Sequence, residues 1–303
     1  MIATAIGGGF LAVAMAVALG GVHGSSEARD VDATSVRATS PAAGSAGSAG
    51  AGKTKRYLQL NIAGNHMHGG AVTPAKSVVA RVKKEQPYVV TLNEVCATQF
   101  TYLKKELADD GYRAAHGLTG THCEDGSAFG NVVLIRIESS VVGNWELPNP
   151  VNGEHRRLLC VKATNYAMVA CATHISYGKE DKAGQVQAVA DRVAAFRDQG
   201  YRVILGGDFN LQPSSPELDP IYDGCYPSGG GVLFETAAQR CGERTGPPTV
   251  EGKWKLDYIF YSGEYTGLGG EVVSTEVSDH AELWGTATYW STVSPRRLMS
   301  AVS

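Results

Sequence analysis

Short apolar segments of strand length recur along almost the whole chain, and this pattern constrains the fold more than any other feature. Strands are predicted at residues 57–64, 87–95, 112–117, 131–137, 140–147, 156–164, 166–176, 201–207, 253–262 and 270–290. Amphipathic helices are predicted at 73–86, with Thr73 as N-cap, at 97–111 and at 180–200. Because both kinds of element are spread over the chain without a repeat, we predict an α/β (α+β) sandwich in one domain, residues 56–293.

The segment before this domain has the composition of an export signal followed by a linker. Residues 1–24 are mostly apolar or small, and no charged residue precedes Glu27, which is typical of a secretory signal peptide. Residues 25–55 are rich in Ser, Ala and Gly and are predicted to be a disordered linker, and residues 294–303 a flexible tail. We therefore expect a secreted protein. The alternative is that residues 1–24, which lack Lys or Arg near Met1, stay uncleaved as a membrane anchor.

The cysteines fit an exported protein that is stabilised by disulfides. The chain has 6 cysteines, and none has CxxC spacing, so a zinc site is not expected. An even number behind an export signal favours disulfides over the alternative of buried thiols, although many pairings are possible. Cys160 and Cys171 are expected to pair because they flank a predicted hairpin turn, and Cys225 and Cys241 because they bracket a Gly-rich loop. Cys96 and Cys123 remain as the third expected pair.

The stretch VILGGDFNLQP, residues 203–213, places two polar side chains directly after an apolar strand. The chain is expected to turn at Gly206 and Gly207. Asp208 and Asn210 then point to one side and Phe209 to the other, because side chains alternate along extended backbone. The alternative is an Asx-type turn formed for local reasons, so this stretch alone does not indicate a function.

Polar side chains break the apolar pattern at the ends of several other predicted strands. Burying such groups is unfavourable unless they pair or bind a cation. Each alone has a simpler explanation: Asn61 could begin a turn, Glu94 could cap a helix, and Asp257 could pair with Lys255. Convergent polar groups on a rigid scaffold are, however, the general form of an active site. The candidate members of such a site are Asn61, Glu94, His174, Asp208, Asn210, Asp257, Asp279 and His280.

A series of motifs carries a resemblance to a known family. In chain order they are LQLNIAG, TLNEV, GNVVLIR, ATHIS, GGDFN, LDYIF and SDHAELW, and GGDFN followed by SDH is the most specific. The chain resembles the endonuclease/exonuclease/phosphatase superfamily, which includes DNase I-like nucleases, abasic-site endonucleases, neutral sphingomyelinases and inositol polyphosphate phosphatases. The resemblance implies a DNase I-like four-layer sandwich of two mixed β-sheets flanked by helices. It also implies metal-dependent hydrolysis of a phosphoester.

The same resemblance implies a metal site made of oxygen ligands. Glu94 and Asn61 are the implied ligands, and Asp279 is implied to support either the metal shell or His174. Mg²⁺ is the expected ion, with Mn²⁺ as the alternative, because both prefer carboxylate and carbonyl oxygens. Whether one or two ions bind is not indicated by the sequence.

The resemblance also implies five catalytic residues. Asp208 would orient or deprotonate the attacking water, and Asn210 would donate to the phosphoryl oxygens. His280, oriented by Asp257, would contact the phosphate or act as a base, and His174 would stabilise charge or serve the leaving oxygen. The sequence does not divide these roles among the two histidines and Asp208.

One departure from the family pattern and several weaker candidates remain. DNase I-like nucleases often place a glutamate before VLIR to pair with the first histidine, whereas this chain has Gly130 and Asn131 there. That is equally compatible with members that cleave lipids or small phosphoesters. The candidate substrate contacts, whose alternative is ordinary solvated surface, are His66, His68, Arg156, Arg157, Lys253 and Lys255.

Together these observations predict a secreted, divalent-metal-dependent phosphodiester hydrolase, with a nuclease as the first expectation. The alternatives are a sphingomyelinase or phospholipase C-type enzyme, for which Trp145 and Trp254 are candidate membrane contacts, and an inositol phosphate phosphatase. A different class is a catalytically vestigial binding or toxin subunit. The net charge of −3 neither indicates nor excludes nucleic acid. We expect a monomer that acts on nucleic acid rather than lipid, without an obligate protein partner.

Overall fold

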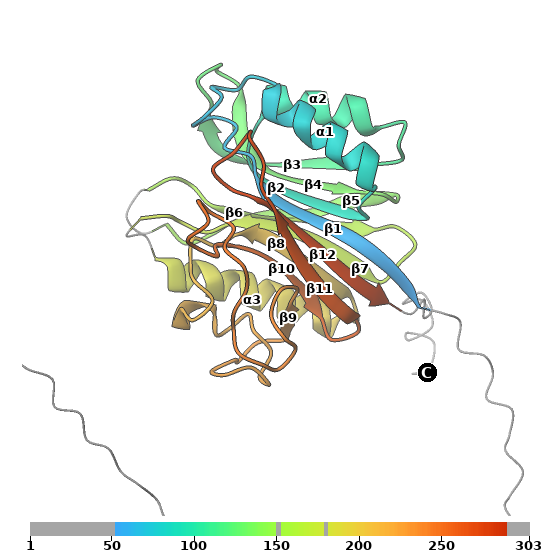
Figure 1. Cartoon of the computed structure of the whole chain (residues 1–303), viewed down its shortest axis with the longest axis vertical. Helices are drawn as coiled ribbons and strands as arrows, with labels where there is room; N and C mark the ends of the chain where they lie inside the picture. The colour runs from blue at the N-terminus through green and yellow to red at the C-terminus, as the bar shows by residue number, and fades with distance from the viewer. Residues whose placement is uncertain (1–51, 150–152, 179–180, 290–303) are drawn as a thin grey trace, which may run out of the picture. The chain divides into compact units, whose positions relative to one another are not determined.

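The computed structural model of the 303-residue chain describes residues 52–149, 153–178 and 181–289. The expected export signal, most of the expected linker and the expected tail lie outside the described residues. The described part contains two mixed β-sheets of six strands each (Figure 1). The first sheet has the order β11 (Thr266–Val273), β12 (Glu282–Tyr289), β1 (Lys53–Asn61), β2 (Val89–Cys96), β4 (Ala128–Ile135) and β3 (Arg113–His122).

The second sheet repeats the plan of the first, with a parallel pair of strands near its centre. β1 and β2 run parallel in the first sheet, and β7 and β8 run parallel in the second. The carboxyl ends of parallel strands meet at one edge, so each sheet can collect side chains there. The second sheet has the order β5 (Ser139–Glu146), β6 (Arg157–Ala163), β7 (Met168–His174), β8 (Arg202–Asp208), β10 (Asp257–Ser262) and β9 (Leu233–Glu235).

Helices cover the outer faces of both sheets, which confirms the expected layered architecture. α1 (Thr73–Glu85) and α2 (Ala97–Leu107) lie together beside the first sheet, and α3 (Lys182–Asp198) lies beside the second (Figure 1). A short 3₁₀ helix, Pro216–Leu218, follows β8. No helix in the described parts of the chain is long and apolar enough to cross a membrane. Representative members of the three largest apolar clusters are Val78, Leu103 and Trp284 under α1 and α2, Tyr57, Leu159 and Tyr261 between the sheets, and Val189, Leu205 and Phe260 under α3.

The structure divides the predicted last strand, residues 270–290, into two strands. β11 ends at Val273 and β12 begins at Glu282. The intervening residues, STEVSDH and Ala281, carry too few apolar side chains for a continuous buried strand. The loop formed by residues 274–281 therefore carries Asp279 and His280 at the start of β12 rather than within a strand.

The expected turn at Gly206 and Gly207 is wrong, because β8 continues through both glycines to Asp208. Their lack of a side chain serves close packing. A Cβ on Gly206 would lie 2.1 Å from Oγ1 of Thr91 in the other sheet, and a Cβ on Gly207 would lie 2.2 Å from the carbonyl oxygen of Thr173. The two sheets therefore approach closely just below the end of β8.

Several element boundaries also differ from expectation. α1 has Val72 rather than Thr73 as its N-cap, and no side chain caps the helix there. β1 begins at Lys53, so residues 53–55 of the expected linker already pair with β12. Pairing with a neighbouring strand extends β1 beyond what its own composition indicates.

Three disulfides join the expected pairs of cysteines. Cys160–Cys171 links directly opposed residues of β6 and β7. Cys96–Cys123 is buried and joins the end of β2 to the turn after β3, and Cys225–Cys241 joins two exposed residues of the segment between β8 and β10.

Candidate active site

Strand register brings three of the predicted residues side by side in the second sheet. His174 of β7 is paired with Asp208 of β8, and Asp208 is paired with Asp257 of β10. All three side chains are buried. An imidazole and two carboxylates therefore occupy adjacent strands where β7 and β8 end and β10 begins.

The Oδ2 atom of Asp208 is the point on which the other side chains converge. It lies 3.1 Å from Nδ2 of Asn61, 3.5 Å from Nε2 of His174 and 3.5 Å from Nε2 of His280. The other oxygen, Oδ1, accepts the backbone N–H of Asn210 at 2.9 Å. That bond fixes the orientation of the carboxylate, so Oδ2 faces the two imidazoles and the amide.

The first sheet contributes an amide and a second carboxylate to the same place. Asn61 ends β1, and its Nδ2 donates to Oε1 of Glu94 at 2.9 Å as well as to Asp208. Glu94 lies in a register shift of β2 between Leu92 and Val95 and has a φ of 58°. A non-glycine residue in this conformation costs of order 1 kcal/mol, and such strain is often found at functional sites. The shift lets Glu94 reach Asn61 while Leu92 and Val95 stay buried.

Burial and a nearby carboxylate perturb the ionisation of Asp208. Burial raises the pKa of Asp208 to about 7, and the negative charge of Asp257 raises it in the same direction. His280 and the N–H groups of Asn210 and Asn61 oppose this effect. A carboxylate whose pKa lies near neutrality is suited to accept a proton from water.

Asp257 orients the second histidine of the site. Its Oδ2 lies 2.8 Å from Nδ1 of His280, and its Oδ1 accepts Nε2–H of Gln59 at 3.2 Å. Burial disfavours the charged ring of His280, but Asp257 outweighs burial, and together with Asp208 it raises the pKa of His280 to about 10. His280 therefore carries a proton on Nδ1, directed at Asp257.

The first histidine has a cationic partner, whereas the second has an anionic one. Nη1 of Arg156 lies 2.8 Å from Nδ1 of His174, and Nη2 of Arg156 lies 3.1 Å from Oε2 of Glu154. Burial and the adjacent Arg156 hold the pKa of His174 well below its usual range, and His280 adds to this. Arg156 thus contacts a histidine of the site, whereas the sequence indicated Arg156 only as a candidate contact of the substrate phosphate.

A buried network of amides supports the site from below, and the sequence analysis missed it. Oδ1 of Asn93 accepts Nε2–H of Gln59 at 2.7 Å and the backbone N–H of Asp208 at 2.9 Å. Nδ2 of Asn93 donates to the carbonyl of Thr173 at 2.8 Å. The network therefore joins both sheets and holds the backbone of Asp208. An amide inside an apolar strand, as in LQLN and TLNEV, was the available signal.

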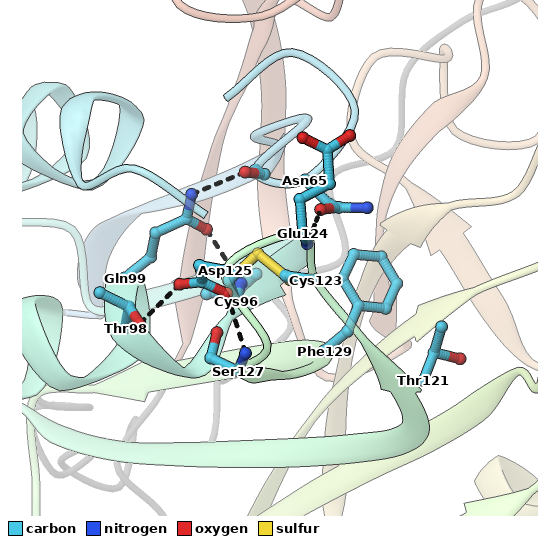
Figure 2. Close-up of a disulfide and its surroundings, with 12 residues drawn as sticks. Asn65, Cys96, Thr98, Gln99, Thr121, Cys123, Glu124, Asp125, Ser127 and Phe129 are labelled. Atoms are coloured by element: carbon cyan, nitrogen blue, oxygen red, sulfur yellow. Dashed lines mark hydrogen bonds between the residues drawn. A yellow bond between two sulfur atoms is a disulfide. The ribbon is translucent and has the colours of Figure 1, made fainter. Parts of the chain in front are cut away.

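The loop that follows Asn61 is fixed from the side of α2 (Figure 2). Gln99 is fully buried and donates to the carbonyls of Gly64 and Ala71 at 2.8 and 2.9 Å. A Cβ on Gly64 would lie 2.2 Å from Oε1 of Gln99, so only glycine fits. The disulfide Cys96–Cys123 lies beside this contact and begins two residues after Glu94.

The turn that carries Cys123 touches the same loop (Figure 2). The backbone N–H of Glu124 donates to Oδ1 of Asn65 at 2.8 Å. Asp125 comes close enough to Cys96 and Cys123 to resemble a metal-ligand group. Both cysteines are, however, joined in the disulfide, so they offer no thiolate to a metal.

The weaker candidates take up varied positions. Nε2 of His68 lies 2.8 Å from the carbonyl oxygen of Val277, which links the 64–70 loop to the 274–281 loop. His66 is exposed. Lys255 is buried, and its ammonium lies 3.1 Å from Oε1 of Glu235. The expectation that Lys255 contacts substrate disagrees with this placement, because its charge is already paired inside the protein.

Three further candidates lie outside the buried cluster. Asp279 is exposed, and the hydroxyl of Ser278 lies 3.4 Å from its Oδ1. Arg157 forms an ion pair with Glu146 at 3.0 Å, and exposed Lys253 pairs with a neighbouring glutamate at 3.3 Å. The charges of Arg157 and Lys253 are therefore partly satisfied by carboxylates of the protein.

The side chains of the site fit a divalent cation that prefers oxygen ligands. Among the described residues, ligand atoms of Asp208, Asp257 and His280 lie within 4.8 Å of one another. Nδ2 of Asn61 joins this group to the carboxylate of Glu94, because it donates to both Asp208 and Glu94. Two buried carboxylates without a cation repel each other, and this repulsion adds to the effect of burial in raising the pKa of Asp208. A hard cation beside Asp208 would relieve that repulsion, and Glu94 and Asn61 are the residues that would hold it.

Comparison with known proteins identifies the family of the chain. A sequence model of the Endonuclease/Exonuclease/phosphatase family matches residues 58–280. The chain belongs to this family. Its members are metal-dependent phosphoester hydrolases, so the chain is an enzyme of that class. No curated protein sequence matches it.

Solved structures show the same fold at low sequence identity. An endonuclease/exonuclease/phosphatase from Beutenbergia cavernae is 22% identical with a TM-score of 0.56, over 78% of this chain and 72% of that one. The human nocturnin catalytic domain is 16% identical with a TM-score of 0.60, over 78% and 93%. A mannosyl-6-phosphatase from Bacteroides thetaiotaomicron is 14% identical with a TM-score of 0.55, over 76% and 98%. These likenesses define the fold and leave the substrate open.

Proposed function

We propose that this member of the family is an exported phosphodiesterase that cleaves nucleic acid with the help of Mg²⁺. The observation that carries the proposal is the convergence of Asn61, His174 and His280 on a single carboxylate oxygen of Asp208. This arrangement offers a base, hydrogen-bond donors and a cation site around one point. Hydrolysis of a phosphoester requires these three elements together.

The residues of the site have complementary roles in this proposal. Asp208, with its pKa raised to about 7, orients the attacking water and accepts its proton. Asn210, His174 and His280 present N–H groups to the phosphoryl oxygens as negative charge develops there. The cation, when it is bound at Glu94, supplies charge neutralisation and polarises the phosphoryl group.

Exposed aromatic side chains support nucleic acid as the substrate. Tyr177 follows His174 by three residues and is 79% exposed, and Trp254 precedes Asp257 by three residues and is 42% exposed. Aromatic rings near a phosphodiester site can stack on unpaired bases. The lipid alternative keeps only Trp254 of its two candidate membrane contacts, because Trp145 is partly buried and packs against Phe196.

Export is supported by the cysteines. Each of the 6 cysteines is engaged in one of the three disulfides, and such bonds persist in oxidising compartments. We propose that the enzyme acts outside the cytoplasm as a monomer.

The experiment is an assay of the full chain, produced by export, against a panel of substrates. Single-stranded and double-stranded DNA, RNA, sphingomyelin, phosphoinositides and sugar phosphates are each tested with Mg²⁺, with Mn²⁺ and with EDTA. We expect metal-dependent cleavage of nucleic acid. The Glu94→Gln variant should need a higher Mg²⁺ concentration, while Glu243→Gln, an exposed glutamate outside the site, serves as the control. Preferred cleavage of lipid or sugar phosphate would overturn the substrate assignment, and no cleavage of any substrate would favour a vestigial site.

A further inference from the structure

The two histidines of the site stand in nearly the same relation to Asp208 but have opposite partners on the other ring nitrogen. Nε2 of each ring lies 3.5 Å from Oδ2 of Asp208. Nδ1 of His280 faces the carboxylate of Asp257 at 2.8 Å, whereas Nδ1 of His174 faces the guanidinium of Arg156 at 2.8 Å. A carboxylate only accepts hydrogen bonds and a guanidinium only donates them. His280 therefore carries a hydrogen on Nδ1, and His174 does not.

The guanidinium determines the tautomer of His174. Arg156 stays protonated throughout the physiological range and has no acceptor atom, so Nδ1 of His174 must offer its lone pair. A neutral imidazole carries one N–H group, which then lies on Nε2. Nε2 also lies 3.2 Å from Nδ2 of Asn210, which donates to the carbonyl of Ile175 at 3.0 Å. The acceptor nearest to the Nε2–H of His174 is therefore Oδ2 of Asp208.

The surroundings hold this arrangement in place. Arg156 is 6% exposed and His174 is 5% exposed, so water does not easily replace either partner. Glu154 binds the far side of the guanidinium at 3.1 Å. The charged groups that face His174 are Arg156, Asp208 and His280, and two of these carry or can carry positive charge. Both burial and the adjacent Arg156 disfavour a second proton on the ring of His174.

We propose that Arg156 is a positioning residue that fixes His174 as a neutral imidazole with its proton on Nε2. His174 then serves the phosphoryl group as a fixed hydrogen-bond donor and does not deliver a proton to the leaving oxygen. This proposal rests on the proposed function in one respect only, namely that the group contacted by His174 is the phosphoryl group of the substrate. It divides the work between the two histidines, which the sequence could not do.

The direct test is the tautomer of His174 in the metal-free full chain. The protein is labelled with ¹⁵N-histidine, and long-range ¹H–¹⁵N correlation spectra are recorded from pH 5.5 to 8. The signals of His174 are assigned by their absence from the spectrum of His174→Gln. We expect an unprotonated Nδ1 and a protonated Nε2 over the whole range. A protonated Nδ1, or a second proton gained within this range, would overturn the proposal. The result does not depend on any substrate, so it is independent of the proposed function.

Variants of Arg156 test the consequence for catalysis. Arg156→Lys keeps a cationic donor and should keep the tautomer and the shape of the pH profile of kcat/KM. Arg156→Glu supplies an acceptor, so the proton should move to Nδ1, and the profile should gain a new ionisation between pH 5.5 and 8. Loss of the Nε2–H donor should lower kcat/KM by about 100-fold at neutral pH. Arg157→Gln, which removes the next guanidinium along β6 and does not touch His174, is the matched control.

The variants also separate a positioning role from a structural one. The proposal would be wrong if Arg156→Glu kept the tautomer of His174 and the pH profile of the natural protein. It would also be wrong, and Arg156 would be structural, if Arg156→Lys and Arg156→Glu lost activity equally with no change of tautomer. Where Arg156→Glu does not fold, the spectrum of the unaltered protein still decides the tautomer.

Discussion

Replacing Asn93 by alanine should both destabilise the protein and disable the site. The side chain of Asn93 is fully buried and forms four hydrogen bonds, to Gln59, the backbone N–H of Asp208, Asn131 and the carbonyl of Thr173. Alanine removes all of them and leaves each partner in an apolar interior. No other amide in the described residues links the two sheets and the backbone of Asp208 in this way.

The size of the effect follows from these four bonds. Each buried hydrogen bond contributes about 1 kcal/mol, and a partner left unsatisfied can cost about 1–3 kcal/mol. A water molecule that enters the vacated space would restore part of this loss. We therefore expect the free energy of unfolding to fall by about 3–5 kcal/mol, a large share of the roughly 5–15 kcal/mol of a typical domain. Because Asp208 loses one of its anchors, kcat/KM should also fall by about ten-fold or more.

The assay is urea unfolding followed by circular dichroism, combined with kinetics at a urea-free condition. Asn144→Ala is the matched control, because Asn144 is only partly buried and its side chain donates one bond, to the carbonyl of Leu118 at 3.0 Å. That variant should lose less than about 1 kcal/mol. If Asn93→Ala were no more destabilised than Asn144→Ala and kept its kcat/KM, the network would not support the site and this reasoning would be refuted.

Three further predictions follow from particular contacts. His280→Ala should nearly abolish turnover, and Asp257→Asn should lower kcat/KM by about 10²-fold. The double variant should be little worse than His280→Ala, since Asp257 and His280 are hydrogen-bonded at 2.8 Å. Fully additive losses of kcat/KM would show that the two residues act independently. Burial lowers the pKa of His116 to about 4, so below about pH 6.5 the unfolded chain takes up a proton that the folded chain does not. The free energy of unfolding should therefore fall by up to about 3 kcal/mol as the pH is lowered from 6.5 toward 4. Urea titrations of His116→Phe should show a flatter pH dependence of this free energy, and an unchanged pH dependence would contradict the assignment. Lys255→Met and Glu235→Gln should each lower the free energy of unfolding by about 3–5 kcal/mol, because each leaves one buried member of a 3.1 Å ion pair without its partner. The double variant should be less destabilised than the sum of the two single variants, and strict additivity in a double-mutant cycle would argue against the pair.

The sequence by itself determined the kind of fold and most members of the candidate site. Apolar runs of strand length and a few amphipathic helices predict a layered sandwich, because each element has a face that must be buried. Asn61, Asp208 and Asp257 stood out since polar groups at the ends of apolar runs need a partner or a function. Cys160 and Cys171 could be paired because a hairpin brings its two strands together locally.

The tertiary structure decided how these residues meet, because register and packing depend on contacts between distant segments. Nothing local shows that Gly206 must be a glycine, since the atom that a Cβ would strike belongs to Thr91 of the other sheet. Equally, the predicted strand 253–262, which contains Lys255, does not reveal that the ammonium of Lys255 turns inward to Glu235. A sequence shows which side chains are unfavourable to bury, whereas the fold determines which partner each of them pairs with.

The pairing of Arg156 with His174 illustrates the same limit at the site itself. The sequence offered Arg156 as a surface cation and His174 as a strand-end histidine, 18 residues apart. Only the pairing of β6 with β7 brings the guanidinium to Nδ1 of the ring. The charge of that neighbour sets which nitrogen carries the proton, so the chemical role of His174 is a property of the tertiary structure.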